Sequence, residues 1–274
     1  MSHPQLRALM QAAYGSAPAE SELEWWLDRN PAGAHVSLEE HGADGVYLAR
    51  VAAEGKERLA AFVVHAVTSP HARGRGIFSR LQRANEEWAA ERGAALALGF
   101  TTDAATRVLT DKLGWELIAR PRVWARLRLP RRGRLRGPEI EAFEARHQTV
   151  DLAGPAHLLK DVDWLDWRYR DSPRPYRLVE TSRGWAVVGI GRHGGLVAGA
   201  VCELRGGLGT LRRAVRACST RAVFALPNAG EERLYAAAGF FPTPWRLHFV
   251  GRSLDGSVPL PRGWRLSLGD TDFF

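Results

Sequence analysis

The sequence is poor in cysteine and in long apolar runs. Its 274 residues include two cysteines, Cys202 and Cys218, which are too few for a disulfide framework and lack the paired spacing of a zinc site. No run approaches the ~18 to 20 apolar residues of a membrane-spanning helix, and the N-terminus lacks the charged and apolar regions of a signal peptide. We therefore predict a soluble cytoplasmic protein with no membrane partner and no metal site.

Lysine is also scarce, so arginine supplies almost all of the positive charge. Lysine and arginine together number 38 against 30 acidic residues, a formal net charge of +8, and only Lys56, Lys112 and Lys160 are lysines. This charge favours an acidic partner such as nucleic acid, an anionic membrane or a phosphorylated cofactor. Solvated surface arginines are the favoured explanation, so net charge alone does not identify a partner.

Strand-like and helix-like patterns alternate along the first half of the chain, which predicts a mixed α/β sheet. The run "RLAAFVVHAV" predicts a strand that ends near Val67. A helix is expected from Ile77, with an apolar stripe through Leu81, Ala84 and Trp88, and Gly93 is expected to close it. A buried strand "AALALGF" and a second helix "DAATRVLTDKLG" follow.

The second half of the chain repeats features of the first half. "LEWWLDRNP" (residues 23–31) is echoed by "LDWRYRDSP" (residues 165–173), and "DAATRVLTDKLGW" (residues 103–115) by "NAGEERLYAAAGF" (residues 228–240). Because both matches occur in the same order, they predict a tandem repeat of two related domains.

A stretch without periodicity separates the two copies. "PRRGRLRGP" (residues 130–138) is rich in proline, glycine and arginine, which predicts a solvated interdomain linker. The predicted domains are therefore residues 1–129 and residues 139–274.

The segment "SPHARGRGIFSRL" (residues 69–81) places basic residues and glycines where a strand passes into a helix. A helix start exposes unpaired N–H groups and a partial positive charge, which acidic residues of the same chain normally use. Here the acidic residues are replaced by His71, Arg73 and Arg75 around Gly74 and Gly76. The pattern favours a phosphate-bearing ligand, and the alternative is a basic surface turn. A Walker A loop and a full dinucleotide fingerprint are both absent.

At this loop the sequence resembles the GNAT acyltransferase superfamily, whose pyrophosphate loop reads [Q/R]-x-x-G-x-[G/A]. "HARGRG" matches that pattern at Gly74 and Gly76, with His71 in the Gln/Arg position. "TSPHARGRGIFSRL" looks like the family's "VxPxxRGxGIxxxL", and "LTDKLGW" resembles its "YxKxGF" ending. The resemblance covers about residues 20 to 128 and, more weakly, residues 160 to 250. It implies an α/β fold of two tandem GNAT-like domains, each a mixed, mostly antiparallel sheet flanked by helices. The second domain is expected to be degenerate.

The resemblance also implies a cofactor site in the first domain. The expected co-substrate is an acyl-CoA, most simply acetyl-CoA, with its diphosphate on the backbone amides from Arg73 to Ile77 and its pantetheine arm beside Val67. The cofactor-binding residues so expected are Val67, His71, Arg73, Gly74, Arg75, Gly76 and Ile77. The second copy keeps only "LRGGLG" (residues 204–209), with fewer basic residues before it and a shorter predicted helix after it.

Two positions depart from the family's catalytic pattern. The family commonly has a glutamate base on the strand before the loop, and the corresponding position here is close to Ala61. His65 lies on the same strand an even number of residues away, so its side chain is expected to face the same side of the sheet as Ala61. We predict His65 as the general base, since an imidazole titrates near neutral pH; a structural histidine is the alternative. The usual tyrosine acid is replaced by Thr110 in the first copy, whereas the second copy has Tyr235 there.

Tyr235 is therefore the predicted general acid, and the alternatives are core packing or a first domain that works without an acid. A carboxylate at Asp103, where the second copy has Asn228, is expected to cap the helix that follows it. Aromatic residues Trp25, Trp26, Trp164 and Trp167 are expected to pack in the core, with an acceptor pocket as the alternative.

Together these patterns predict an N-acetyltransferase that transfers an acyl group to a small-molecule or peptide amine. The missing glutamate and tyrosine would also fit a non-catalytic CoA-binding protein. Nucleic-acid binding through Arg131, Arg132, Arg134 and Arg136 is a third possibility, which no interleaved aromatic platform supports. The acceptor, the acyl chain and the oligomeric state stay open.

Overall fold

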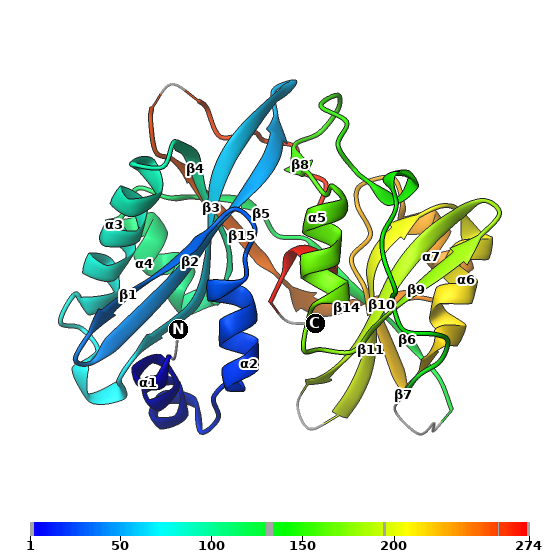
Figure 1. The fold of residues 1–274 in the computed structure, drawn as a ribbon, viewed down its shortest axis with the longest axis horizontal. Helices are drawn as coiled ribbons and strands as arrows, with labels where there is room; N and C mark the ends of the chain where they lie inside the picture. The colour runs from blue at the N-terminus through cyan, green and yellow to red at the C-terminus, as the bar shows by residue number, and fades with distance from the viewer. Residues whose placement is uncertain (1–2, 130–133, 194–195, 257, 273–274) are drawn as a thin grey trace. The chain divides into compact units, whose positions relative to one another are not determined.

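The computed structural model describes residues 3–129, 134–193, 196–256 and 258–272 (Figure 1). These residues form two compact units, and each unit is assembled from three separate segments. The first unit comprises residues 1–119, 150–160 and 248–264, and the second comprises residues 120–149, 161–247 and 265–274. The boundaries thus differ from the predicted sequential division, because segments of each half belong to the other unit.

The first unit is built on a seven-stranded sheet. Its helices and helical turns are α1 (Pro4–Tyr14), α2 (Glu20–Leu23), the π-helical η1 (Glu24–Asp28), the 3-10 turn η2 (Pro70–Ala72), α3 (Ile77–Ala90) and α4 (Asp103–Lys112). Its strands are β1 (Ala34–Glu39), β2 (Gly42–Ala53), β3 (Lys56–Thr68), β4 (Ala94–Thr101), β5 (Glu116–Ala119), β8 (His157–Leu158) and β15 (His248–Ser253). The strand order is β1-β2-β3-β4-β15-β5, with β8 on β2, and only β3 and β4 are parallel.

The second unit is built on a six-stranded sheet and a two-stranded sheet. Its helices and turns are η3 (Ala145–His147), α5 (Val162–Leu165), the π-helical η4 (Asp166–Arg170), α6 (Leu208–Ala217), α7 (Glu232–Ala237) and η5 (Leu268–Asp270). Its strands are β6 (Arg122–Leu127), β7 (Arg134–Leu135), β9 (Tyr176–Thr181), β10 (Gly184–His193), β11 (Leu196–Arg205), β12 (Cys218–Ser219), β13 (Ala222–Ala225) and β14 (Phe241–Arg246). The larger sheet has the order β14-β6-β13-β11-β10-β9, with β11 and β13 parallel, and β7 pairs with β12.

The element order confirms the fold class predicted from the sequence. Apart from the turn η2 in the first copy and the short β12 in the second, the first copy runs α2-η1-β1-β2-β3-α3-β4-α4-β5 and the second runs α5-η4-β9-β10-β11-α6-β13-α7-β14. Both sheets are mixed and mostly antiparallel. The "LEWWLD" and "LDWRYR" echoes form the same feature, a short α-helix that continues into a π-helical turn.

The two sheets exchange their last strands. Strand β6 follows β5 along the chain, yet it lies between β13 and β14. Strand β15 follows β14 along the chain, yet it lies between β4 and β5. Each sheet is therefore completed by a strand from the other half of the sequence, which explains why the two compact units are interleaved.

The structure describes only part of the predicted linker, residues 134–138. Its residues 130–133 lie outside the described residues. Residues Arg134 and Leu135 form β7 opposite Ser219 and Cys218, and the N–H of Arg136 donates to the carbonyl of Ala217 at 2.8 Å. This part of the stretch is thus attached to the second unit.

Helix α3 buries a more polar face than its sequence predicts. Ile77 and Leu81 are buried as expected, but Ala84 is exposed and Trp88 only half-buried. The buried face instead includes Gln82, Asn85 and Glu86.

Two of these buried polar side chains, Asn85 and Glu86, are hydrogen-bonded to the sheet and to a neighbouring tryptophan. The Asn85 side chain accepts from Ser37 Oγ at 2.8 Å and donates to the Asp44 carbonyl at 3.0 Å. Trp115 Nε1 donates to Glu86 at 2.7 Å. Side chains with partners of this kind tolerate burial, and hydrophobic periodicity cannot reveal them.

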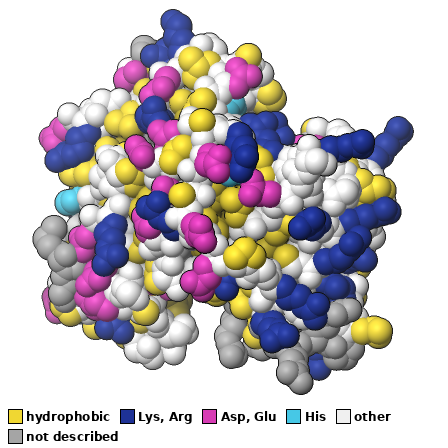
Figure 2. All heavy atoms as spheres, turned by 45° about the vertical axis from the view of Figure 1, so that its right-hand side comes forward, with side chains coloured by type: hydrophobic (Ala, Val, Ile, Leu, Met, Phe, Trp, Pro, Cys, Tyr) yellow, Lys and Arg dark blue, Asp and Glu magenta, His cyan; other side chains and the backbone are white. Residues whose placement is uncertain are grey.

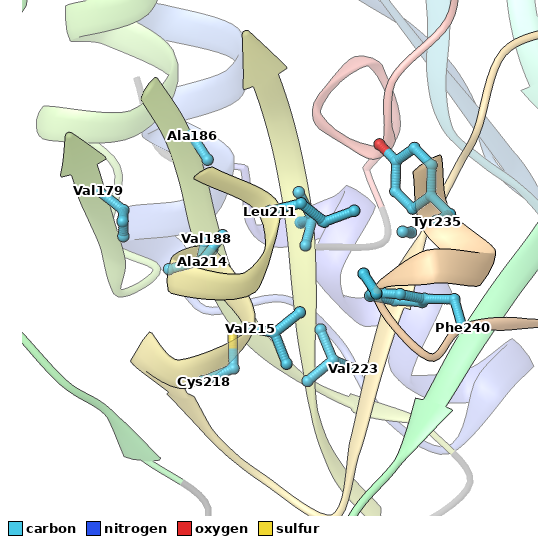
Figure 3. Close-up of a cluster of buried hydrophobic side chains, with 13 residues drawn as sticks. Val179, Ala186, Val188, Leu211, Ala214, Val215, Cys218, Val223, Tyr235 and Phe240 are labelled. Atoms are coloured by element: carbon cyan, nitrogen blue, oxygen red, sulfur yellow. The ribbon is translucent and has the colours of Figure 1, made fainter. Parts of the chain in front are cut away.

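The second unit has a continuous apolar core (Figure 3). Leu211, Ala214 and Val215 of α6 pack towards Val188 and Val223 of the sheet. Tyr235 and Phe240 close the α7 end of the same cluster, with ring centroids 5.6 Å apart.

A buried arginine ties the last residues of the chain to this unit. Arg168, in η4, donates from Nε to the Gly269 carbonyl at 3.1 Å. Its two terminal nitrogens donate to the Tyr176 hydroxyl and to the Thr271 carbonyl, each at 2.8 Å. The turn η5 is thereby tied to η4, and the Ser267 hydroxyl before it donates to Glu203 of β11 at 2.9 Å.

Candidate functional site

The loop between β3 and α3 contains two glycines with left-handed backbone conformations. Gly74 and Gly76 adopt left-handed φ values of 82° and 75°, which glycine alone adopts without cost. Gly76 is the residue before the first turn of α3, and that turn contains no acidic residue. The helix starts at Ile77, as expected. No acidic side chain of its first turn offsets the partial positive charge of the N-terminal amides of α3.

The amides of this loop are available to a ligand. Among the described residues, the N–H groups of residues 74 to 77 donate no hydrogen bond to another group of the chain. His71, Arg73 and Arg75 are exposed around them. Unpaired N–H groups beside cationic side chains are the features of an anion site.

One residue that holds the loop was missed by sequence reasoning. Arg80, one turn into α3, donates from NH1 to the Arg75 carbonyl at 3.0 Å. Its Nε and NH2 donate to the Glu39 carboxylate at 2.9 and 2.6 Å. Because the guanidinium bridges the loop and β1, it holds the backbone in place and is less available to a ligand than Arg73 and Arg75. Its position four residues after Gly76 was the available signal.

Strand β3 has a free edge next to the loop. Its pairing with the parallel strand β4 runs from Leu59 to Phe62 and stops there. Val67 is buried and pairs on the opposite edge with Ala43. Within the described residues no strand pairs with residues 63 to 68 on the β4 side, so this edge has the geometry to accept an extended chain by β-type hydrogen bonds. The pairing of Val67 with a pantetheine arm stays a prediction.

Tyr14 is a second residue of the site that the sequence did not suggest. Its hydroxyl donates to the Ala66 carbonyl at 2.9 Å, next to Val67 on β3. Partial burial raises the pKa of this phenol, and the positive charge of Arg73 opposes that shift. Helix α1 thus brings a tyrosine to the strand end beside the basic loop.

His65 lies in a β-bulge of strand β3. The register with β2 passes from Gly45 opposite Val64 to Ala43 opposite Val67, and His65 has a left-handed φ of 58°. Histidine is among the few side chains that adopt this conformation with some frequency. Bulges of this kind redirect a side chain and interrupt the alternation of faces along a strand.

The predicted orientation of His65 is therefore wrong. Ala61 packs beneath α3 in a cluster with Ala89. The His65 ring instead lies edge-on to Trp26, with centroids 6.2 Å apart, and Trp26 contacts Tyr47 on the face of Phe62. His65 is buried among aromatic rings on the opposite face of the sheet. Its catalytic role stays a prediction.

Tyr235 belongs to the core of the second unit. It is 4% exposed and packs against Phe240 (Figure 3). Burial, followed by the charges of Glu231 and Glu203, raises the pKa of the phenol above its ordinary value. A phenol that holds its proton more tightly is a poorer acid, so its surroundings favour the packing alternative, while its catalytic role stays untested.

Asp103 does not cap its helix as predicted. Thr102 precedes the helix and its Oγ1 accepts from the Ala105 N–H at 3.3 Å. The exposed Asp103 carboxylate lies 3.1 Å from His248 Nε2, and His248 Nδ1 lies 3.0 Å from Thr106 Oγ1. The exchanged strand β15 supplies this histidine, which is why no local pattern indicated the pair.

The tryptophans are core residues, as expected. Trp25 and Trp26 are each 1% exposed, with ring centroids 4.7 Å apart. Trp164 and Trp167 are also buried, with ring centroids 6.1 Å apart. Trp25 and Trp26 belong to the π-helical turn η1, whereas Trp164 belongs to α5 and Trp167 to η4.

The second copy presents a weaker counterpart of the loop. Helix α6 has 10 residues against 14 in α3, as the sequence predicted. Gly206 has a φ of 142°, and a Cβ there would lie 2.7 Å from Thr210 Oγ1. Close packing explains this glycine without a ligand.

The described residues show neither a membrane-spanning helix nor a metal cluster. No described helix combines the length and the apolar character needed to cross a membrane. No group of three or more histidine, cysteine, aspartate or glutamate side chains in the same residues is arranged around a metal position.

Comparison with solved structures identifies the fold. A GCN5-related N-acetyltransferase from Anabaena variabilis aligns with a TM-score of 0.60 at 12% identity, over 92% of this chain and 70% of that one. A conserved protein from Enterococcus faecalis described as a probable N-acyltransferase has a TM-score of 0.58 at 13% identity, with coverages of 92% and 70%. Eis1 from Mycobacterium abscessus has a TM-score of 0.56 at 14% identity, with coverages of 93% and 72%.

These alignments span both units, so the chain has the two-domain fold of GCN5-related N-acetyltransferases and the predicted GNAT resemblance is confirmed at the level of the fold. No family model matches the sequence. No curated protein matches it either.

Proposed function

We propose that this chain is an N-acyltransferase that takes an acyl-CoA, most simply acetyl-CoA, and acylates an amine. The observation that carries the proposal is the β3–α3 loop, where N–H groups of residues 74 to 77 lack internal acceptors beside exposed Arg73 and Arg75. The fold shared with N-acetyltransferases supports the same function. The acceptor is a small-molecule or peptide amine.

The residues of the loop suit a diphosphate. Left-handed glycines let the backbone approach the ligand closely, and guanidinium groups bind phosphate oxygens with two parallel hydrogen bonds. His71, Arg73 and Arg75 would hold the phosphates with the amides from Gly74 to Ile77, while Arg80 keeps the loop in position. Val67 would orient the pantetheine arm along the free edge of β3. The bound acyl-CoA supplies an activated thioester.

His65 is our candidate for the proton acceptor. A neutral imidazole would accept the proton that the amine loses as it attacks the thioester carbon, an effect typically worth about 10² to 10⁴ in rate. The edge contact with Trp26 holds the ring in one orientation. Tyr235 stays the predicted proton donor only if its phenol is released from the core. The burial of Tyr235 favours the alternative, in which the first unit works without a tyrosine acid.

Acetyl-CoA binding at the loop is tested with two variants of residue 76 that have side chains of nearly equal shape and differ in charge. Gly76→Asp is expected to weaken acetyl-CoA binding at least about tenfold relative to Gly76→Asn, since a carboxylate repels a diphosphate. Both side chains tolerate a left-handed φ better than most, and the nearest atom to a Cβ there is Arg80 NH1 at 3.6 Å. Isothermal titration calorimetry measures the two affinities.

The asparagine variant is the matched control for strain at residue 76, and thermal melting shows that both variants are folded. Equal affinities of the two variants would remove the diphosphate from this loop. Absence of binding to the wild-type protein would contradict the acyltransferase proposal as a whole.

The role of His65 is tested by a substitution that suits its backbone. His65→Asn keeps a residue that tolerates φ near 58° and removes the titratable ring. We expect transfer to an accepted amine to slow at least tenfold, with acetyl-CoA affinity unchanged. A slowing of less than tenfold in steady-state turnover would exclude His65 from the mechanism and leave the donor site intact.

A non-catalytic CoA-binding protein is the competing function. Ala61 and Thr110 stand where the family commonly has its base and its acid, and the Thr110 hydroxyl donates within its own helix to the Thr106 carbonyl at 3.0 Å. Such a protein would bind acetyl-CoA in calorimetry and release no CoA with any amine of a broad panel. Turnover with one amine decides for the enzyme.

We also propose that the chain acts in the cytoplasm. Cys202 and Cys218 are both buried free thiols, as expected in a reducing compartment.

A further inference from the structure

The net positive charge of the chain comes from one of its two units. The second unit has 23 arginines, no lysine and 13 acidic residues, a formal net charge of +10. The first unit has 15 basic and 17 acidic residues, a formal net charge of −2. The proposed diphosphate loop lies in the first unit, so the donor site does not account for the excess charge.

Part of the excess is gathered on one surface, which we name the arginine face. It consists of Arg134 and Arg136 at β7, Arg213 and Arg216 on α6, and Arg221 after β12, all of them exposed. Helix α6 buries Leu211, Ala214 and Val215 against the sheet, so its arginines occupy the opposite side.

Backbone pairing brings the segments of the arginine face together. Strand β12 directly follows α6 and pairs with β7, which places Arg134 opposite Ser219. The N–H of Arg136 donates to the carbonyl of Ala217, the residue after Arg216. Three segments of the chain thus contribute guanidinium groups around the C-terminal end of α6.

Neither ion pairing nor helix capping accounts for these arginines. Within the described part of the chain, no acidic side chain lies within 4 Å of any of the five guanidinium groups, whereas Arg177 and Arg265 of the same unit pair with Glu139 and Glu231. The terminal carbonyls of α6 are served by Arg128, whose NH1 donates to Val215 and Cys218, each at 2.6 Å. The charge of the arginine face is therefore available to a partner.

The arginine face carries few apolar anchors. Among the described residues, no large apolar side chain exposed on the surface belongs to α6, β7 or β12, and the exposed Leu127 and Leu129 lie at its margin, where Leu127 pairs with Ala222, the residue after Arg221. Protein interfaces have an apolar centre, and peripheral membrane sites combine charge with apolar side chains that insert. Nucleic-acid sites are instead dominated by cationic contacts to phosphates, which arginine makes with two parallel hydrogen bonds.

We propose that the arginine face binds the phosphate backbone of a nucleic acid without regard to base sequence. Figure 2 shows blue side chains gathered on the right of the molecule, the side on which Figure 1 draws α6 and α7, with few magenta ones among them. The surface presents no exposed aromatic side chain on α6, β7 or β12 for base stacking among the described residues, so the contacts are with the backbone.

The test measures binding of the full chain to fluorescein-labelled 20-nucleotide RNA and to a 20-base-pair DNA duplex by anisotropy, from about 50 to 300 mM KCl. The logarithm of the affinity is expected to fall linearly with the logarithm of the salt concentration. Arg213→Gln/Arg216→Gln is expected to weaken duplex binding at least tenfold at 0.1 M salt and to reduce the salt slope by about 2.

The matched control is Arg83→Gln/Arg107→Gln, which removes the same charge from exposed positions on α3 and α4. The control is expected to keep the wild-type slope. Equal losses in both double variants would show a general charge effect and overturn the proposal, as would absence of binding at 50 mM salt. Binding to phosphatidylserine vesicles or to polyglutamate as tight as binding to RNA would overturn it in favour of another partner.

Discussion

Arg168→Ala is expected to lower the free energy of unfolding by about 3 to 5 kcal/mol, because it removes the donor from three buried oxygens and leaves a cavity. Arg168 is 1% exposed and its guanidinium donates to the Gly269 and Thr271 carbonyls and to the Tyr176 hydroxyl. Its charge also lies against the rings of Tyr169 and Tyr176. Urea denaturation followed by tryptophan fluorescence measures the loss.

The neighbouring Arg170 provides the control. It is exposed and forms ion pairs with Asp166 and Asp171 at the surface, so Arg170→Ala is expected to cost less than about 1 kcal/mol. A loss for Arg168→Ala that is no larger than this would mean that the last turn of the chain contributes little to the stability of the second unit.

Asp44→Asn is expected to raise stability at pH 8 and to flatten the dependence of stability on pH. Asp44 is completely buried in β2, and burial, together with the nearby Glu86 carboxyl, raises its pKa from 3.8 to about 8. Between these pH values the folded protein keeps a proton that the unfolded chain releases. Stability therefore falls as pH rises through this range, by up to about 1.4 kcal/mol per pH unit.

The measurement is urea denaturation of the wild type, Asp44→Asn and the exposed control Asp111→Asn at pH 5 to 8. The wild type and the control are expected to lose stability across the range, and Asp44→Asn to lose much less. A smaller slope should persist, because burial also raises the pKa of Glu86. A variant no more stable than the wild type at pH 8 would contradict a neutral Asp44 in the folded protein.

Local features of this chain were predictable, whereas long-range pairing was not. The apolar stripe predicted a helix from Ile77, and Gly74 and Gly76 were expected to let the backbone approach a ligand, because these features depend on the local residues themselves. The echo between the halves predicted two copies with one element order. The exchange of β6 and β15 depends on which sheet edge each strand reaches, and a strand carries the same alternation whichever neighbour it pairs with.

In the candidate site, too, the local features were predictable and the features that depend on long-range pairing were not. The cationic and glycine residues of the loop are consecutive in sequence and were identified directly. The orientation of His65 was wrong because one bulge shifts the alternation of faces, and nothing in "FVVHAV" marks a bulge. The pairing of Asp103 with His248 joins residues brought together only by the exchanged strand.

The strand exchange also sets the order in which this protein can mature on the ribosome. When residue 129 has been synthesised, β4 and β5 exist, but β15, which lies between them, is more than a hundred residues from being made. The buried and largely apolar β4 must wait with an open edge through translation of the whole second copy. The sheet of the half that carries the basic loop is thus completed only once residues 248–253 have been made.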